Sequence, residues 1–331
     1  NRSIFSRKLQ ELMTDRLNKG QQTILFLTRR GYAGFVSCRS CGEVMKCPHC
    51  DVSLSEHKGG RLICHYCGYT QPMPKICPKC GSKYILGFKA GTQQIEEKLK
   101  ELYPGVRTLR MDADTTRTKD SYEKILSSFA NGEADVLIGT QMIVKGHDFP
   151  KVTLVGILAA DLSLNASDYR AGERTFQLLT QAVGRAGRGV LPGEAVIQTY
   201  QPDHYAITCA AAQDYESFYQ EEILYRELSG YPPVAHMLAI QIYGKEEENV
   251  KQLALRLTDV VKSNMDFLSG KQKEQSNKKI QVLGPAPANI SKINDIYRYV
   301  FYVKHAEYDV LVEVKDRLEE TLRQWQPRQM S

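Results

Sequence analysis

The amino-acid sequence predicts an α/β protein in which an open parallel sheet carries an inserted cysteine-rich module and is followed by a small α+β domain. Strands alternate with helices over residues 1–203 apart from one interruption, and this alternation is typical of a parallel sheet covered by helices. The interruption holds eight cysteines in four CxxC pairs between residues 38 and 80. Beyond residue 230 the predicted order becomes strand, helix, strand, strand, helix, which indicates a separate α+β domain.

The α/β domain is predicted to begin with a helix and a buried strand. Within residues 4–18 apolar side chains recur at helical spacing, and Gly20 predicts the end of that helix. Residues 23–28 predict a buried strand. Further strands are expected at residues 85–88, 108–112, 136–140, 152–158 and 195–200. Two of these runs are continuously apolar, as strands buried on both faces of a parallel sheet require. Thr92 is the expected N-cap of the helix after the insertion.

The C-terminal part is predicted to contain a helical, aromatic-rich connector and the α+β domain. The connector covers residues 204–230, and Pro232 and Pro233 follow it. The expected strands lie at residues 237–243, 280–283 and 297–304, and the expected helices carry Val250 to Val260 and Leu311 to Leu322. The polar segment 269–279 is expected to be a solvated connector, with contact to nucleic-acid phosphates as the alternative.

These elements divide the chain into three parts. We expect the discontinuous α/β domain at residues 1–37 and 88–203, the inserted module at 38–87, and the connector with the C-terminal domain at 204–331. An insertion is tolerated at a loop because the entropy of closing a longer loop rises slowly with length. Metal binding would let the inserted module fold without sharing the core of its host.

The four CxxC pairs predict two structural zinc sites. One CxxC turn can direct two sulfurs at a tetrahedral metal, so two pairs complete a four-cysteine site. The two inner pairs are separated by 13 residues, which is close to zinc-ribbon spacing and predicts nested pairing. The expected ligands are Cys38, Cys41, Cys77 and Cys80 for one zinc, and Cys47, Cys50, Cys64 and Cys67 for the other.

Other uses of these cysteines are less consistent with the pattern. A disulfide framework and thioredoxin-like redox chemistry are the alternatives, but compact CxxC repeats without a visible signal peptide favour metal. His49 and His65 lie inside CxxC turns and are not needed as ligands, because eight sulfurs fill eight positions.

The overall charge gives little support for nucleic-acid binding. The formal charge of +6 falls to about +2 when eight thiolates and two zinc ions are counted. Binding to a polynucleotide would therefore depend on local placement of basic residues. No apolar run approaches the length of a membrane span, so we expect a cytoplasmic protein that makes no membrane contact.

Two stretches of the α/β domain point to its chemistry. GTQMIVKGHDF (residues 139–149) and QAVGRAGR (residues 181–188) resemble motifs V and VI of superfamily 2 helicases, and the RRGY at residues 29–32 resembles motif IV. Arg185 and Arg188 are three residues apart, so on a helix they would share one face, as two cations directed at one anionic group must. The resemblance implies a RecA-like second helicase lobe.

The position of the cysteine-rich insertion narrows this resemblance. A second helicase lobe interrupted after motif IV by four CxxC pairs resembles the PriA family of replication-restart helicases, and the resemblance covers essentially the whole chain. It implies an ATP-driven, 3′ to 5′ DNA helicase of the bacterial cytoplasm that recognises stalled forks and helps to reload the replication machinery. It also implies a monomer that binds single-stranded and forked DNA, with replication-restart and single-strand-binding proteins as partners.

The resemblance assigns roles to individual residues. Arg185, Arg188 and Gln181 would act on the γ-phosphate of ATP, one arginine serving as an arginine finger. Gly146, Asp148 and Gly184 would lie close to the nucleotide. Thr140, Arg29, Arg30 and Thr92 would contact DNA. Small residues at Gly184 and Gly187 would allow phosphate or another backbone segment to approach closely.

The sequence lacks the motifs of a first helicase lobe. It contains no GxxxxGK followed by serine or threonine, and no DExH-type acidic motif after a buried strand. ATP and Mg²⁺ are therefore expected only together with a first lobe, and the chain alone is expected not to hydrolyse ATP.

Two other functions remain open. The chain could be a non-catalytic zinc-ribbon module that binds nucleic acid or protein, with Tyr66, Tyr69 and Tyr84 either stacking on bases or packing around the metal cores. The C-terminal part could be a docking platform for replication proteins. Its candidate aromatic residues are Tyr215, Phe218, Tyr219 and Tyr225, although their near-helical spacing is more typical of a core-facing stripe.

Overall fold

The computed structural model divides into two compact units. It describes residues 4–27, 36–38, 40–41, 43, 45, 48, 54–57, 60–63, 69–87, 91–112, 115–116, 118–140, 149–158, 160–164, 169–199, 201–263 and 279–325. The first unit is Asn1–Phe35 with Leu86–Glu222, and the second is Val36–Ile85 with Ile223–Ser331. The inserted module and the C-terminal domain thus fall in one unit, whereas the division into three domains stays a prediction.

The first unit is built on a five-stranded sheet in which every neighbouring pair is parallel. The strand order is β10-β9-β1-β8-β7. The strands are β1 (Gln22–Leu27), β7 (Thr108–Met111), β8 (Val136–Gly139), β9 (Val152–Leu158) and β10 (Glu194–Ile197). The predicted open parallel sheet is confirmed, and its first strand lies at the centre because the later strands add on both sides of it.

Helices cover both faces of this sheet. They are α1 (Arg7–Asn18), α2 (Thr92–Leu102), α3 (Lys119–Ala130), α4 (Asp161–Leu164), α5 (Ala171–Val183) and α6 (Tyr205–Ala212). Leu25 of β1 packs with α1 and α2, whereas its neighbours Ile24 and Phe26 pack with α3, α5 and α6. This alternation follows from the strand period of two, and it explains why the strands β8 and β9 are buried on both faces.

One glycine sets the distance between α1 and the sheet. A Cβ atom at Gly156, in the middle of β9, would lie 2.7 Å from Leu25 Cδ2 and 2.9 Å from Leu9 Cδ1. Leu9 is fully buried, so the close approach is part of the core. A larger residue at position 156 would push α1 away from the sheet.

The inserted module contains two small sheets. β2 (Val36–Cys38) pairs with β6 (Ile85–Gly87), where the chain enters and leaves the module. β3 (Ser55–His57), β4 (Arg61–Ile63) and β5 (Thr70–Pro72) form an antiparallel sheet. A small apolar cluster of buried residues supports the module. We call it the module core: Val36, Cys38, Met45, Leu54, Leu62, Cys77 and Ile85.

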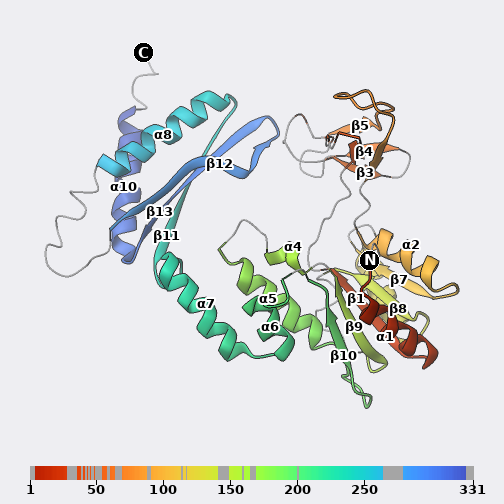
Figure 1. Ribbon diagram of the computed structural model, residues 1–331. Helices are drawn as coiled ribbons and strands as arrows, with labels where there is room; N and C mark the ends of the chain where they lie inside the picture. Colours follow the sequence, from red (N-terminus) through yellow and green to blue (C-terminus); the bar gives the residue numbers. More distant parts are fainter. Residues whose placement is uncertain are drawn as a thin grey trace. The chain divides into compact units, whose positions relative to one another are not determined.

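The C-terminal domain is a three-stranded antiparallel sheet with two helices on one side (Figure 1). Its elements are β11 (His236–Gly244), α8 (Glu247–Ser263), β12 (Gln281–Ile293), β13 (Ile296–His305) and α10 (Tyr308–Trp325). β13 lies between β11 and β12. The predicted order of elements is confirmed, but β12 runs ten residues beyond its predicted end at Leu283. Most of the predicted 269–279 connector lies outside the described residues.

The aromatic residues of α7 (Tyr215–Ser229) do not form one core-facing stripe. Phe218 is buried and stacks on Phe176 with ring centroids 4.0 Å apart. Tyr215, Tyr219 and Tyr225 are 62%, 44% and 42% exposed. The expectation of a core-facing stripe is therefore wrong for three of the four residues. Among the described helices, none is long and apolar enough to cross a membrane.

Candidate zinc centre and arginine loop

Two turns of the same geometry hold the outer cysteines of the module. The backbone N–H of Cys38 donates to the carbonyl oxygen of Glu43, five residues on, at 2.8 Å. The N–H of Cys77 donates to the carbonyl oxygen of Ser82, also five residues on, at 2.8 Å. Gly81 closes the second turn with a φ of +70°, a conformation that glycine adopts without steric cost. Each CxxC pair is thereby fixed as a loop whose two sulfurs point the same way.

The four outer sulfurs lie together at distances that suit a tetrahedral metal. All four are within 4.8 Å of one another. Cys38 Sγ lies 3.6 Å from Cys80 Sγ, and Cys41 Sγ lies 3.7 Å from Cys77 Sγ. Zinc bound by four sulfurs at about 2.3 Å would separate them by ~3.8 Å, whereas a disulfide requires about 2.05 Å. The disulfide alternative is therefore contradicted at these four cysteines.

Within the group, the neighbouring sulfurs shift the pKa values of Cys38 and Cys80 in opposite directions. Burial raises the pKa of the Cys38 thiol, but hydrogen bonds from the backbone N–H groups of Cys41 and Ser40 and from the thiols of Cys80 and Cys41 together bring the pKa down to about 6. At Cys80 the backbone N–H of Ser82 lowers the pKa, yet the neighbouring thiols of Cys41, Cys38 and Cys77 raise it, to about 12. One thiolate thus opposes the next, which a divalent cation would relieve.

Side chains also tie the two turns together. Lys79 Nζ lies 3.0 Å from Glu43 Oε2, and the hydroxyl oxygens of Ser40 and Ser82 are 2.8 Å apart. Glu43 raises the pKa of Lys79. The lysine and glutamate are both well exposed, so their ion pair contributes little to stability and mainly orients the turns.

The inner cysteines lie outside the described residues. Cys47, Cys50, Cys64 and Cys67 are all in this group, as are His49 and His65. β4 ends at Ile63, directly before Cys64, and β5 begins at Thr70, shortly after Cys67. The inner zinc site stays a prediction.

The second predicted site follows α5, and here the structure corrects the expected geometry. α5 ends at Val183, and Gly184 is its C-cap. Arg185 and Arg188 therefore do not share a helix face, because they lie beyond the helix. The backbone N–H of Arg185 donates to the carbonyl oxygen of Ala182, and Arg188 Nε donates to that of Gly184 at 2.8 Å. We call residues 184–193 the arginine loop. Gln181 is exposed on the last turn of α5.

Glycines lock the arginine loop onto the backbone around it. Gly187 has a φ of +71°, and a Cβ there would lie 2.4 Å from the backbone nitrogen of Gly193. A Cβ at Gly189 would lie 2.3 Å from the carbonyl oxygen of Pro150. The N–H of Gly187 donates to the carbonyl oxygen of Val152 at 3.0 Å. Of the two expected uses for glycine here, Gly187 serves the close approach of another backbone segment, at the amino end of β9.

Two residues predicted to contact DNA, Thr140 and Thr92, lie at the carboxyl ends of the strands, whereas the arginine loop contacts the amino end of β9. Thr140 directly follows β8 and is 9% exposed. Thr92 is the first residue of α2, and the N-cap is Gly91, so the expected capping role is wrong. The Thr92 hydroxyl instead donates to Oδ2 of Asp112, the residue after β7, at 2.5 Å. Met111 and Phe26 both pair with Gly139, which brings these strand ends together.

Several predicted residues cannot be placed. Arg29, Arg30, Gly146 and Asp148 lie outside the described residues. Their neighbours in sequence are informative, however. Leu27 ends β1 beside the end of β8, and the carbonyl group of Pro150 lies beside Gly189 of the arginine loop. Gly139 and Thr140, the first residues of motif V, thus lie where β8 ends, and Pro150, the residue after motif V, lies beside the arginine loop.

Sequence reasoning missed two residues that organise these sites. Asp112 accepts a hydrogen bond from Thr92 and forms an ion pair with Arg110. In the sequence it could have been found as a carboxylate at the end of a predicted strand, because parallel α/β sheets bind ligands at that end of their strands. Gly193 packs directly against the backbone of Gly187 within the arginine loop. A glycine after a proline indicated a turn there but not the partner of that turn.

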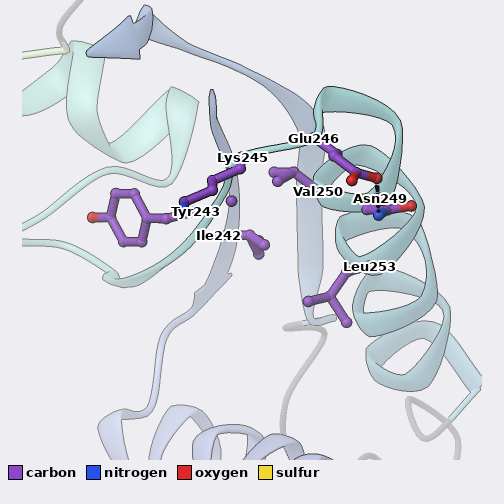
Figure 2. Close-up of a pocket in the computed structure, with 8 residues that line it drawn as sticks. Ile242, Tyr243, Lys245, Glu246, Asn249, Val250 and Leu253 are labelled. Atoms are coloured by element: carbon purple, nitrogen blue, oxygen red, sulfur yellow. Dashed lines mark hydrogen bonds between the residues drawn. The ribbon is translucent and has the colours of Figure 1, made fainter. Parts of the chain in front are cut away.

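A hollow in the C-terminal domain is separate from both candidate sites. It has a volume of about 290 Å³ and is lined by the end of β11 and the first turns of α8 (Figure 2). Lys245, Glu246 and Asn249 supply its polar groups, and Asn249 Nδ2 donates to Glu246 Oε2 at 2.6 Å. None of the predicted site residues lines this hollow.

Comparison with known proteins agrees with the arrangement along the chain. Three family models match: the PriA DNA helicase Cys-rich region domain at residues 47–72, the helicase conserved C-terminal domain at 77–190, and the primosomal protein N C-terminal domain at 227–330. Among solved structures, S. cerevisiae Dbp5 bound to RNA and ADP BeF3 gives a TM-score of 0.32 at 13% identity, over 67% of this chain and 42% of that chain. Because that score is low, the lobe assignment rests on the family model and the strand order.

Curated relatives extend the match over nearly the whole chain. The replication restart protein PriA of Bacillus subtilis (strain 168) is 45% identical over 308 residues, 93% of this chain and 37% of that protein. The replication restart protein PriA of Synechocystis sp. is 42% identical over 325 residues, 97% of this chain and 38% of that protein. The chain thus spans less than half the length of these relatives. It belongs to the PriA family of replication restart proteins and corresponds to their C-terminal part.

Proposed function

We propose that the chain supplies the second motor lobe, a two-zinc module and the C-terminal domain of an ATP-driven DNA helicase that restarts replication at stalled forks. The observation that carries this proposal is the arginine loop, which is held by backbone contacts at Val152, Pro150 and Gly193 while Arg188 stays exposed. A rigid loop that presents a cation to solvent is what an arginine finger requires, because its guanidinium must meet a phosphate bound elsewhere.

The ATP site would be completed by a first lobe that binds the nucleotide and Mg²⁺. Arg185 and Arg188 would stabilise the charge that develops on the transferred γ-phosphoryl group, and Gln181 would orient the same face. Gly146, Asp148 and Gly184 would lie next to the nucleotide. The chain itself has no GxxxxGK motif, so the isolated chain would not hydrolyse ATP.

DNA would lie along the carboxyl ends of the strands of the parallel sheet. Thr140 and Thr92 lie there, and the segment that carries Arg29 and Arg30 follows β1 from there. One strand of DNA could therefore contact all of them. Movement along that strand would run from 3′ to 5′, as in the family resemblance. The partners would be single-stranded and forked DNA, other replication-restart proteins and single-strand-binding protein, and the protein would act as a monomer in the bacterial cytoplasm.

Both zinc ions would be structural. Four sulfurs fill the tetrahedral positions of each site, which leaves no open position for water or substrate. The outer group has the donor set and the spacing for this role. The zinc ions would hold the module rigid against DNA or a partner without taking part in ATP hydrolysis.

DNA-stimulated ATP hydrolysis by the full-length protein tests the proposal. Arg188→Ala is expected to lower turnover by a factor on the order of 10³, with ATP binding retained. Arg174→Ala, an exposed arginine earlier on α5, is the matched control and should leave turnover within about twofold. Gln181→Ala is compared with Gln177→Ala, one turn earlier on the same helix. Unchanged turnover in both Arg185→Ala and Arg188→Ala would refute the assignment.

The non-catalytic binding module remains a second candidate because of Tyr84. This tyrosine is 71% exposed beside the second cysteine turn, whereas Tyr69 packs on the module core. An exposed ring can stack on an unpaired base. If Tyr84→Ala lowered the affinity of the isolated chain for single-stranded DNA while Arg185 and Arg188 were dispensable in the full-length protein, the binding module would be the better description.

A further inference from the structure

The tip of the β12–β13 hairpin contacts the inserted module, although the two are far apart in sequence. Both belong to the second compact unit. Ile293, at the end of β12, packs against the module core, which includes Cys38 and Cys77. Lys292 Nζ donates to the carbonyl oxygen of Pro48 at 3.1 Å, across 244 positions of sequence. Pro48 stands between Cys47 and Cys50 in the sequence, and the cluster that Ile293 contacts contains two of the outer cysteines.

The hairpin is built to present these two side chains. Its turn is Asn294-Asp295, with φ values of 50° and 61°, the left-handed pair of a tight type I′ turn. Ile293 pairs directly with Ile296 across the turn. The pairing of β12 with β13 shifts between Pro287 and Lys292, and such a bulge bends the strand. The tip is therefore a short, bent arm with a fixed end.

Lys292 is held in place before it reaches the module. Its ammonium group lies 3.2 Å from Asp295 Oδ1 and 4.8 Å from the centre of the Tyr297 ring. The side chain is only 18% exposed, although its neighbours Asn294 and Asp295 are exposed. Restricting a long side chain in this way removes most of the entropy cost of its bond to Pro48.

The module gains more from Ile293 than a larger domain would. The module core is one small cluster of seven buried side chains, two of which are cysteines. An isoleucine added to so small a core is a large fraction of its apolar packing. Because Cys38 and Cys77 belong to the same cluster, metal binding at those sulfurs and packing of Ile293 stabilise the same arrangement.

We propose that the β12–β13 tip is a docking arm that binds the inserted module through Ile293 and Lys292 and couples its outer zinc site to the C-terminal domain. The partner surface is the module core together with the Pro48 carbonyl. Docking by itself does not depend on the metal, whereas the coupling rests on the proposed zinc sites. By thermodynamic linkage, the free energy by which zinc binding stabilises docking equals the free energy by which docking stabilises zinc binding.

Hydrogen exchange of backbone amides in the complete zinc-loaded chain tests docking. Ile293→Ala is compared with Ile296→Ala, the same residue type directly across the hairpin but outside the module core. The reporting amides are those of Cys38, Met45 and Leu54, which are hydrogen-bonded inside the module. They are expected to exchange roughly fivefold faster or more in Ile293→Ala, and to change by less than about twofold in Ile296→Ala.

A milder pair, Ile293→Val and Ile296→Val, keeps the test valid if the alanine variant does not fold. Equal effects of the two positions, or no effect at either, would overturn docking. Zinc content is measured on every sample. With zinc present, chelation should accelerate exchange at the tip amides of residues 292–297. No change there would overturn the coupling. Absence of zinc, together with a specific effect of Ile293→Ala, would refute the zinc sites while leaving docking established.

Discussion

Arg188 Nε donates a hydrogen bond to the carbonyl oxygen of Gly184, the residue that caps α5. The bond joins the first and second glycine-arginine pairs of the GRAGR sequence into one turn. It uses one edge of the guanidinium, which fixes the plane of the group. A lysine could keep the positive charge at this position but has no second nitrogen to fix its direction.

Arg188→Lys is therefore expected to behave as a poor substitute in the full-length protein. DNA-stimulated ATP turnover should fall by at least about tenfold while ATP binding stays close to normal, because an ammonium cannot hold the bond to Gly184 and reach a phosphate together. Steady-state turnover and nucleotide binding measure the two effects. Full activity in the lysine variant would show that only charge matters at this position.

Gly187→Ala is expected to disrupt the arginine loop. The substitution places a Cβ 2.4 Å from the Gly193 nitrogen and strains a φ of +71°. Gly105→Ala is the control, because Gly105 has a φ of +88° but nothing within 4 Å of its Cβ. Strain alone costs about 1–2 kcal/mol, so the excess loss in Gly187→Ala over Gly105→Ala isolates the collision of the loop segments. Chemical denaturation of both variants measures it, and equal losses would contradict close packing of the loop.

Zinc content should follow the outer cysteines and not Cys209. The chain is expected to bind two zinc ions, and Cys77→Ser is expected to leave one, because three sulfurs hold zinc much more weakly than four. Cys209→Ser, which changes a half-buried cysteine of α6, should leave two. Metal analysis after gel filtration distinguishes these outcomes. Two zinc ions in Cys77→Ser would show that this sulfur is not a ligand.

The ion pair of Arg107 with Asp135 predicts a specific pH dependence of stability. Burial raises the pKa of Asp135, but hydrogen bonds from the Arg107 side chain and backbone N–H outweigh burial and lower it. A lowered pKa contributes stability above the ordinary pKa of aspartate, and this contribution is lost as pH falls through the folded-state value. Because Arg107 is exposed, the contribution should be less than about 1 kcal/mol.

Urea denaturation of the wild type and Asp135→Asn tests this sign. The wild type should be the more stable at pH 7, and the difference should shrink as pH is lowered from about 5 to about 3. A difference that stays constant over this range would show that the carboxylate charge does not carry the interaction.

Local patterns in the sequence determined most of the fold. The continuous apolar runs of β8 and β9 specify strands buried on both sides, and the helical spacing in α1 and α8 specifies which faces they bury. CxxC spacing was enough to group Cys38, Cys41, Cys77 and Cys80, because the turn geometry of each pair is encoded within a few residues. These features depend on neighbours along the chain.

The contacts between elements that are remote in sequence were decided only by the tertiary structure. The GRAGR sequence predicts a helix as readily as a loop, and α5 ends at Val183 because backbone contacts at Val152 and Gly193 hold the following residues in turns. Thr92 is a residue type that often caps helices, but its hydroxyl donates a hydrogen bond to Asp112, which follows β7. Ile293 and Lys292 gave no signal at all, since their partners lie more than 200 positions away. Such contacts depend on packing between remote segments, and a single sequence carries no local pattern for them.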